Sequence, residues 1–103
     1  MIREYLNKFA KKIVHRNLKK ISNGQLLITE SNNIYKFGTQ SVLKAEIKVT
    51  NPSFYTEILL GGSIGASEAY IHKSWTSKDV TKVIQLMARN QSTMDSIEGP
   101  FRI

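Results

Sequence analysis

The spacing of apolar residues changes at Gly24, and this change limits the folds open to the chain. From Ile2 to Ile21 apolar residues recur at intervals of three and four, the spacing of one helix face. After Gly24 they alternate with polar residues, most clearly over 42–50, and such alternation is typical of a strand with one buried face. We therefore predict an α+β domain, a small antiparallel sheet with helices packed on one face.

Glycine, proline and polar breaks divide the rest of the sequence. We expect strands over 25–29 and 34–37, a short helix that ends at Gly61-Gly62, a second short helix after it, a brief strand over 73–75 and a last helix that closes near 90. With 103 residues the chain can bury one core, so residues 1–90 are predicted to form one domain. Residues 91–103 lose periodicity and contain Gly99-Pro100, and we interpret them as a linker or frayed tail.

The positive charge is concentrated in the first helix. Seven of the fifteen lysines and arginines and one of the eight acids lie in residues 1–20, so this segment carries +6 of the net charge of +7. A basic amphipathic helix can lie in a membrane interface with its cations on anionic headgroups. It can also bind nucleic acid phosphates, or simply cover a core and solvate its lysines. The candidate lipid contacts are Lys8, Lys11, Lys12, Arg16 and Lys19, with Phe9 and Ile13 available for insertion.

The stretch from Gly61 to Trp75 holds most of the glycine, the only tryptophan and an acid among apolar residues. We interpret its glycines as turn and packing positions rather than a cofactor cradle, because no strand–turn–helix pattern surrounds them. Glu68 must face solvent, accept backbone hydrogen bonds or carry a raised pKa, and we favour the solvent-facing interpretation.

This stretch also carries a resemblance to a known family. The chain resembles the N-terminal domain of cyclopropane-fatty-acyl-phospholipid synthases over roughly residues 5 to 90. The pieces that carry the resemblance are Asn23-Gly24-Gln25-Leu26, Phe37-Gly38, Asn51-Pro52-Ser53-Phe54-Tyr55, Gly61-Gly62-Ser63-Ile64-Gly65, Glu68-Ala69-Tyr70, Trp75, Asp79 and Ala88-Arg89-Asn90. His72 and Lys73 stand where the family has an acidic residue and then glycine, and a lysine at a position of positive φ would carry strain.

The resemblance implies a lipid-engaging accessory domain of an S-adenosylmethionine-dependent methyltransferase of lipid biosynthesis. It implies as partners an anionic phospholipid membrane surface and a catalytic methyltransferase domain, in cis or in trans, and a cytoplasmic location at the inner face of the membrane. In this family the catalytic domain follows a segment like Gln91–Ile103. S-adenosylmethionine is therefore expected to bind only that domain, and we expect no methyl transfer from this chain alone. Gly61, Gly62, Gly65, Glu68, Tyr70 and Trp75 would then form an apolar groove or the face that docks the catalytic domain. In element order the chain is also similar to sterol-carrier-protein-like domains, which enclose an apolar tunnel.

Other chemistry has little support in the sequence. The absence of cysteine excludes disulfides and thiolate chemistry, and no apolar run approaches the roughly 18 residues of a membrane span. His15 and His72 are far apart and are interpreted as solvent-facing and turn residues, so we expect no metal site, catalytic residue or cofactor site. The aromatics are not interleaved with basic residues, and we expect no nucleic acid partner. A purely structural scaffold between domains remains an alternative function.

Overall fold

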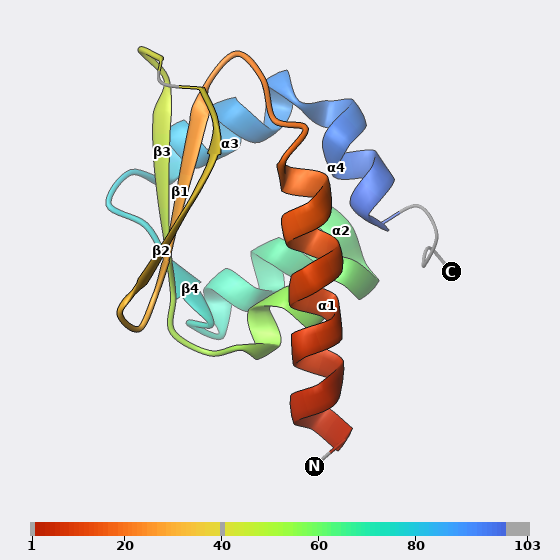
Figure 1. Cartoon of the computed structure of the whole chain (residues 1–103). Helices are drawn as coiled ribbons and strands as arrows, with labels where there is room; N and C mark the ends of the chain where they lie inside the picture. Colours follow the sequence, from red (N-terminus) through yellow and green to blue (C-terminus); the bar gives the residue numbers. More distant parts are fainter. Residues whose placement is uncertain (1, 40, 99–103) are drawn as a thin grey trace.

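The sheet occupies one side of the molecule, and the helices cover one of its faces (Figure 1). The computed structural model describes residues 2–39 and 41–98. This α+β arrangement is the predicted fold class, with helices on one sheet face. The helices are α1 (Ile2–Leu18), α2 (Ser53–Ile71), α3 (Val80–Arg89) and α4 (Gln91–Glu98), and the strands are β1 (Gln25–Glu30), β2 (Asn33–Gly38), β3 (Lys44–Val49) and β4 (Trp75–Thr76).

The sheet is mixed rather than antiparallel, which corrects the prediction. Its strand order is β2-β1-β3-β4, and β1 pairs antiparallel with β2 but parallel with β3. The hairpin turn after β1 was readable from the polar residues 30–33, but the partner of β3 was not. β3 pairs with the free edge of β1 rather than with β2, and it runs in the same direction as β1.

The backbone segments at Gly24 and Gly38 approach each other closely where β2 ends beside the start of β1. A Cβ at Gly38 would lie 2.3 Å from the Gly24 carbonyl oxygen, and Gly38 has φ +83°. The amide of Thr39 donates to the Gly24 carbonyl, and the amide of Gln25 donates to the Leu43 carbonyl. A side chain would not fit between these segments, so glycine is needed where β2 ends beside the start of β1.

The core lies between the inner sheet face and the helices. Leu26 and Ile28 of β1 are opposite Ala45 and Ile47 of β3, and all four are buried. The alternation predicted over 42–50 is therefore confirmed. Phe54, Tyr55 and Leu59 of α2, Val83 and Leu86 of α3, and Ala10, Val14 and Leu18 of α1 complete this core from the helical side.

Helix α2 consists of two short helices joined at a kink, as its glycines predict. Gly62 has φ 55° and ψ −132°, outside the helical region, and it separates the two halves. The second half folds against the first, because a Cβ at Gly65 would lie 2.0 Å from the carbonyl oxygen of Glu57. Gly61, one residue before the kink, has no atom within 4 Å of its Cβ position.

The segment that follows residue 90 is helical, which corrects the expectation of a linker or tail for Gln91–Glu98. Helix α4 packs against α1 and α2, and it buries Thr93 and Ile97. The Asn90 side chain holds its start, accepting from the Ser22 amide at 2.9 Å and donating to the Ser22 carbonyl at 2.9 Å. The expected tail at 99–103 lies outside the described residues.

Two glycine substitutions test the packing of α2. We expect Gly65→Ala to destabilise the domain by about 1–3 kcal/mol, because the new methyl group meets fixed backbone atoms. Gly61→Ala is the matched control, since it enters open space in a helix and is expected to be neutral or to stabilise by up to about 1 kcal/mol. Urea unfolding of both variants measures the difference, and equal stabilities would contradict the close approach at Gly65.

Candidate functional site

The first turns of α1 expose large apolar side chains. Ala10, Val14 and Leu18 form the buried face of this helix. Four residues on another side are exposed, and we call them the apolar patch: Ile2 (77%), Tyr5 (72%), Leu6 (53%) and Phe9 (54%). They share a side of the helix through their spacing of three and four, and the beginning of α1 extends beyond the rest of the fold (Figure 1).

The predicted lipid contacts on α1 differ in their surroundings. Lys8, Lys12, Arg16 and Lys19 are exposed, as is Phe9. Ile13 is only partly exposed and packs against the core. Lys11 is also partly buried, because its ammonium is held by residues of the sheet.

A groove runs between α1 and the edge strand β2. It has a volume of about 790 Å³, and we call it the basic groove. The lining residues are Lys8, Lys11, Lys12, His15 and Arg16 of α1, Lys19 directly after it, and Ile34, Tyr35, Lys36 and Phe37 of β2. Six of these ten residues are lysine or arginine and none is an acid, so the described lining favours anions.

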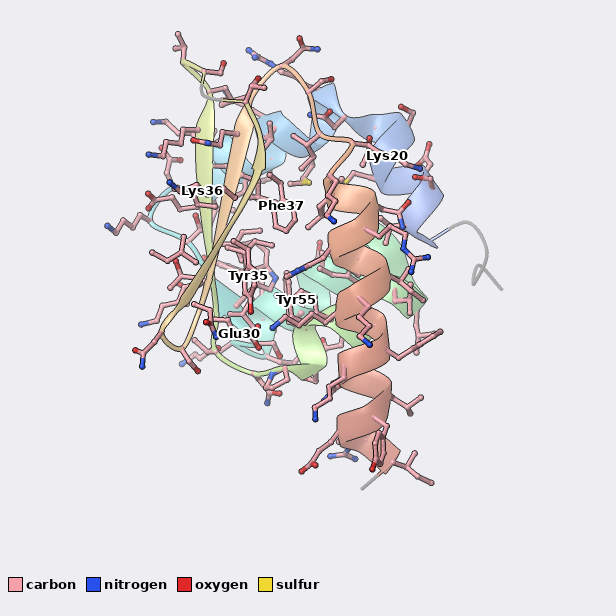
Figure 2. The ribbon with its side chains drawn as sticks, viewed as in Figure 1. Lys20, Glu30, Tyr35, Lys36, Phe37 and Tyr55 are labelled. Atoms are coloured by element: carbon pink, nitrogen blue, oxygen red, sulfur yellow. The ribbon has the colours of Figure 1, made fainter. Side chains whose placement is uncertain are left out.

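A cluster of polar and aromatic side chains joins α1 to the sheet and to α2 at this groove. Tyr35, Phe37, Glu30 and Tyr55 lie in the space between the strands and α1 (Figure 2). The ring of His15 contacts three of these rings edge-on, at centroid distances of 4.7 Å to Tyr35, 5.0 Å to Phe37 and 5.3 Å to Tyr55. We call Lys11, His15, Glu30, Tyr35, Phe37 and Tyr55 the His15 cluster.

Hydrogen bonds and one ion pair order the polar atoms of the cluster. Lys11 Nζ lies 2.8 Å from Glu30 Oε1 and donates to the Tyr35 hydroxyl at 3.0 Å. The Tyr55 hydroxyl donates to Glu30 Oε1 at 3.4 Å and is 3.1 Å from His15 Nε2. The His15 Nε2 and the Tyr55 hydroxyl thus share a hydrogen bond whose donor is set by the tautomer of the ring.

The electrostatics of the cluster determine the protonation states of its side chains. Burial, together with the neighbouring Lys11 charge, lowers the pKa of His15 to about 4. Burial raises the pKa of Tyr55, as does the Glu30 carboxylate, so its hydroxyl stays protonated. Burial alone would lower the pKa of Lys11, but its bonds to Glu30 and Tyr35 raise it overall. Neither Lys11 nor Tyr55 is thus activated as a base or nucleophile at neutral pH.

Sequence reasoning placed His15 on the solvent-facing side of the helix and did not select Glu30, Tyr35, Phe37 or Tyr55. The structure corrects this: His15 is half-buried among three aromatic rings. One feature of the sequence indicated that His15 could be buried: it lies among the lysines of α1 but directly follows Val14, which is buried. Its partners come from three other elements, so no local spacing identifies them.

The predicted site residues of the Gly61–Trp75 stretch do not share one surface. Gly61, Glu68 and Tyr70 are exposed, whereas Gly62, Gly65 and Trp75 are buried. Glu68 is thus on the solvent side, as favoured. The Trp75 indole donates to the Ala66 carbonyl at 2.8 Å, which fixes the ring in the core.

The turn at His72-Lys73 keeps a left-handed residue. Lys73 has φ 66°, so the strain predicted for a lysine at a position of positive φ is present. The amide of Lys73 donates to the Tyr70 carbonyl at 3.0 Å, and the Thr50 hydroxyl donates to the Lys73 carbonyl. These two bonds hold the turn without glycine.

An apolar pocket of about 110 Å³ lies inside the core. It is lined by residues of the sheet and all four helices, among them Gly62, Trp75, Met87 and Met94. A cavity of roughly 150 Å³ accepts benzene in another protein, so this volume suits a small apolar molecule rather than a lipid chain.

The described part of the chain adds no metal or membrane-spanning element. Over residues 2–39 and 41–98 no group of three or more His, Cys, Asp or Glu side chains is placed to hold a metal ion. Within the same residues, none of the helices has the length and apolar character to cross a bilayer.

No protein-family model, curated protein or solved structure matches the chain.

The pKa of His15 predicts how stability varies with pH. The unfolded chain takes up a proton on His15 near pH 6.5, whereas the folded chain does so only near pH 4. The contribution of His15 to the free energy of unfolding is therefore fully present above pH 6.5, and it is lost as the pH falls toward 4. The charges that act on the ring are Lys11 and Lys19 of α1 and Glu30 of β1, with the hydroxyl of Tyr55 from α2.

We expect His15→Gln to flatten the dependence of unfolding free energy on pH between 6.5 and 4. His72→Gln is the control, because His72 is exposed at the end of α2 and should leave the wild-type slope unchanged. Urea unfolding at several pH values measures both. A wild-type slope in the His15 variant would show that this imidazole is not held neutral.

Proposed function

We propose that this domain binds the surface of anionic phospholipid membranes through α1, as an accessory domain of a methyltransferase similar to cyclopropane-fatty-acyl-phospholipid synthase. The observation that carries the proposal is the apolar patch beside exposed cations on one helix. A helix with this distribution lies in the membrane interface with its apolar side among the acyl chains.

The apolar patch supplies the insertion energy. Tyr5 and Phe9 are large side chains that remain more than half exposed in the folded domain, so a bilayer can remove area that the core does not. Burying one such side chain fully is worth about 1.5–3 kcal/mol. Ile13 contributes less to insertion than its position in the sequence predicts, because it already packs against the core.

The exposed cations supply the preference for anionic lipid. Lys8, Lys12 and Arg16 lie within two turns of Phe9, on the side of α1 that faces away from its buried residues. Each cation near an anionic surface is worth about 1 kcal/mol, and this part of the attraction falls as salt rises. The basic charge therefore attracts the domain, and the patch retains it when salt screens the charge.

The resemblance over residues 5 to 90 supports the choice of a methyltransferase partner. Such a domain also needs a surface for its catalytic partner, and the outer side of α2 offers one. Its exposed apolar residues are Leu60 (57%), Ile64 (72%), Tyr70 (43%) and Ile71 (75%). Of the docking residues expected from sequence, Gly61, Glu68 and Tyr70 are exposed and can contact a partner. Gly62, Gly65 and Trp75 are buried and can affect docking only through the packing of the domain.

The aromatic rings near the lysines of α1 are not open stacking platforms, although Tyr35 and Phe37 lie close to these lysines. Phe37 and Tyr55 are buried, so their faces are closed to a base. The Tyr35 ring is covered by the Lys11 ammonium, at 4.7 Å from its centroid, and by the edge of His15. Base stacking needs an open aromatic face, and these rings use theirs within the domain.

Vesicle co-sedimentation across a salt series tests the proposal. The wild-type chain should bind vesicles that contain phosphatidylglycerol, bind neutral phosphatidylcholine vesicles weakly, and retain part of its binding at high salt. We expect the double variant Leu6→Ser/Phe9→Ser to lose at least about tenfold in affinity and all salt-resistant binding, because both side chains are more than half exposed.

Ile84→Ser is the matched control, since Ile84 is 62% exposed on α3 and should not contact the membrane. The triple variant Lys8→Gln/Lys12→Gln/Arg16→Gln should lose the preference for phosphatidylglycerol. Lys11 stays unchanged in this variant because its loss would leave Glu30 without its ion pair. A wild-type chain that ignores both vesicle types at low salt would leave the structural scaffold as the better function.

A further inference from the structure

We infer that the basic groove is a binding site for a phosphate ester, and that its ligand in the cell is the headgroup of an anionic glycerophospholipid. The inference rests on the proposed membrane function and shares the cations Lys8, Lys12 and Arg16 with it, but it concerns the groove rather than the apolar patch. The apolar patch would enter the bilayer without regard to lipid structure, whereas the groove would hold a single headgroup.

The cations of the groove form a row along α1. Lys8, Lys12 and Lys19 recur at intervals of four and seven residues, so their side chains leave the same side of the helix. With a rise of 1.5 Å per residue, the row extends about 16 Å from Lys8 to Lys19. The wall of β2 faces this row with Tyr35 and Phe37 and has no acid in the described lining, whereas the Lys36 side chain between them points to the other face of the sheet (Figure 2).

The Glu30 carboxylate, which lies beside the groove, is already engaged. Glu30 pairs with Lys11 at 2.8 Å and accepts from Tyr55 at 3.4 Å, so its charge is largely used within the His15 cluster. The same contacts fix the Lys11 ammonium between Glu30 and Tyr35 before any ligand arrives. A fixed cation together with several mobile ones suits a phosphate group, which accepts several charge-assisted hydrogen bonds.

The dimensions favour the headgroup over the acyl chains. The groove has about 790 Å³, within the usual size of ligand sites, whereas the internal pocket has about 110 Å³. Lys8 lines the groove and is the neighbour of Phe9 in the apolar patch, so one end of the groove adjoins the patch. A headgroup can therefore occupy the groove while its chains remain in the bilayer that the patch enters.

His15 supplies an internal reporter for this site. It lines the groove, its Nε2 is engaged by Tyr55, and its pKa is about 4 in the ligand-free domain. A bound phosphate would favour the charged imidazole and raise this pKa, because an adjacent anion stabilises the protonated form. Adsorption of phosphate to scattered surface lysines would leave the ring unaffected.

The experiment is a titration of the isotope-labelled full chain followed by NMR, with four probes used separately. They are inorganic phosphate, glycerol 3-phosphate, dihexanoyl phosphatidylglycerol below its micelle concentration, and a short single-stranded oligonucleotide. We expect saturable shifts confined to residues 8–19 and 34–37, a rise in the His15 pKa, and tighter binding of phosphatidylglycerol than of inorganic phosphate.

Lys12→Gln/Lys19→Gln should weaken phosphatidylglycerol binding at least about tenfold, since both lysines line the groove. Lys44→Gln/Lys48→Gln removes the same charge from exposed positions of β3 outside the groove and should bind like wild type. Equal weakening in both variants, unsaturable shifts, or tighter binding of the oligonucleotide than of phosphatidylglycerol would overturn the inference.

The vesicle assay separates this inference from the proposed function. Leu6→Ser/Phe9→Ser should lose vesicle binding and keep phosphatidylglycerol binding in the NMR titration. If the wild-type chain binds vesicles but none of the soluble phosphates, the headgroup site fails and membrane binding stands. If it binds soluble phosphatidylglycerol but no vesicles, membrane binding fails and the groove stands as a phosphate site.

Discussion

The ion pair between Lys11 and Glu30, with the His15 ring packed beside it, connects the first helix to the sheet. Helix α1 packs mainly on α2 and α4, and the side chains of the His15 cluster fill the space between it and β2. Removing one partner of a partly buried ion pair leaves a charge without compensation, which costs more than the pair contributes. The position of α1, and with it the width of the basic groove, therefore depends on these contacts.

This attachment leaves α1 with three distinct sides. Val14 and its neighbours one turn away enter the core, and His15 and Lys11 face the aromatic rings of the cluster. The third side has no cover within the described fold, and Phe9 and Leu6 remain exposed on it. An exposed apolar cluster at the projecting end of a basic helix is costly in water, and this cost is the physical basis of the proposed membrane binding.

Much of the fold was predictable where local sequence determines local structure. Alternation over 42–50 identified the inner face of β3, and Gly61-Gly62 identified the break within α2. Prediction failed where a distant neighbour decides the outcome. Ile84 fits the apolar spacing of α3 but is exposed, whereas Leu86 is completely buried, because the sheet and α4 determine which side of α3 faces inward. For the same reason, Gln91–Glu98 is a packed helix although its own sequence is weakly periodic.

The sequence by itself determined that a basic amphipathic helix begins the chain, that strands follow it, and that glycines bend the next helix. These features depend on backbone conformation and on spacing within one element. Only the tertiary structure decided that Phe9 stays exposed while Ile13 packs against the core, and that His15 meets Tyr35 and Tyr55. Periodicity shows which residues share a side of a helix, but the covering of that side depends on elements 20 to 40 positions away in the chain.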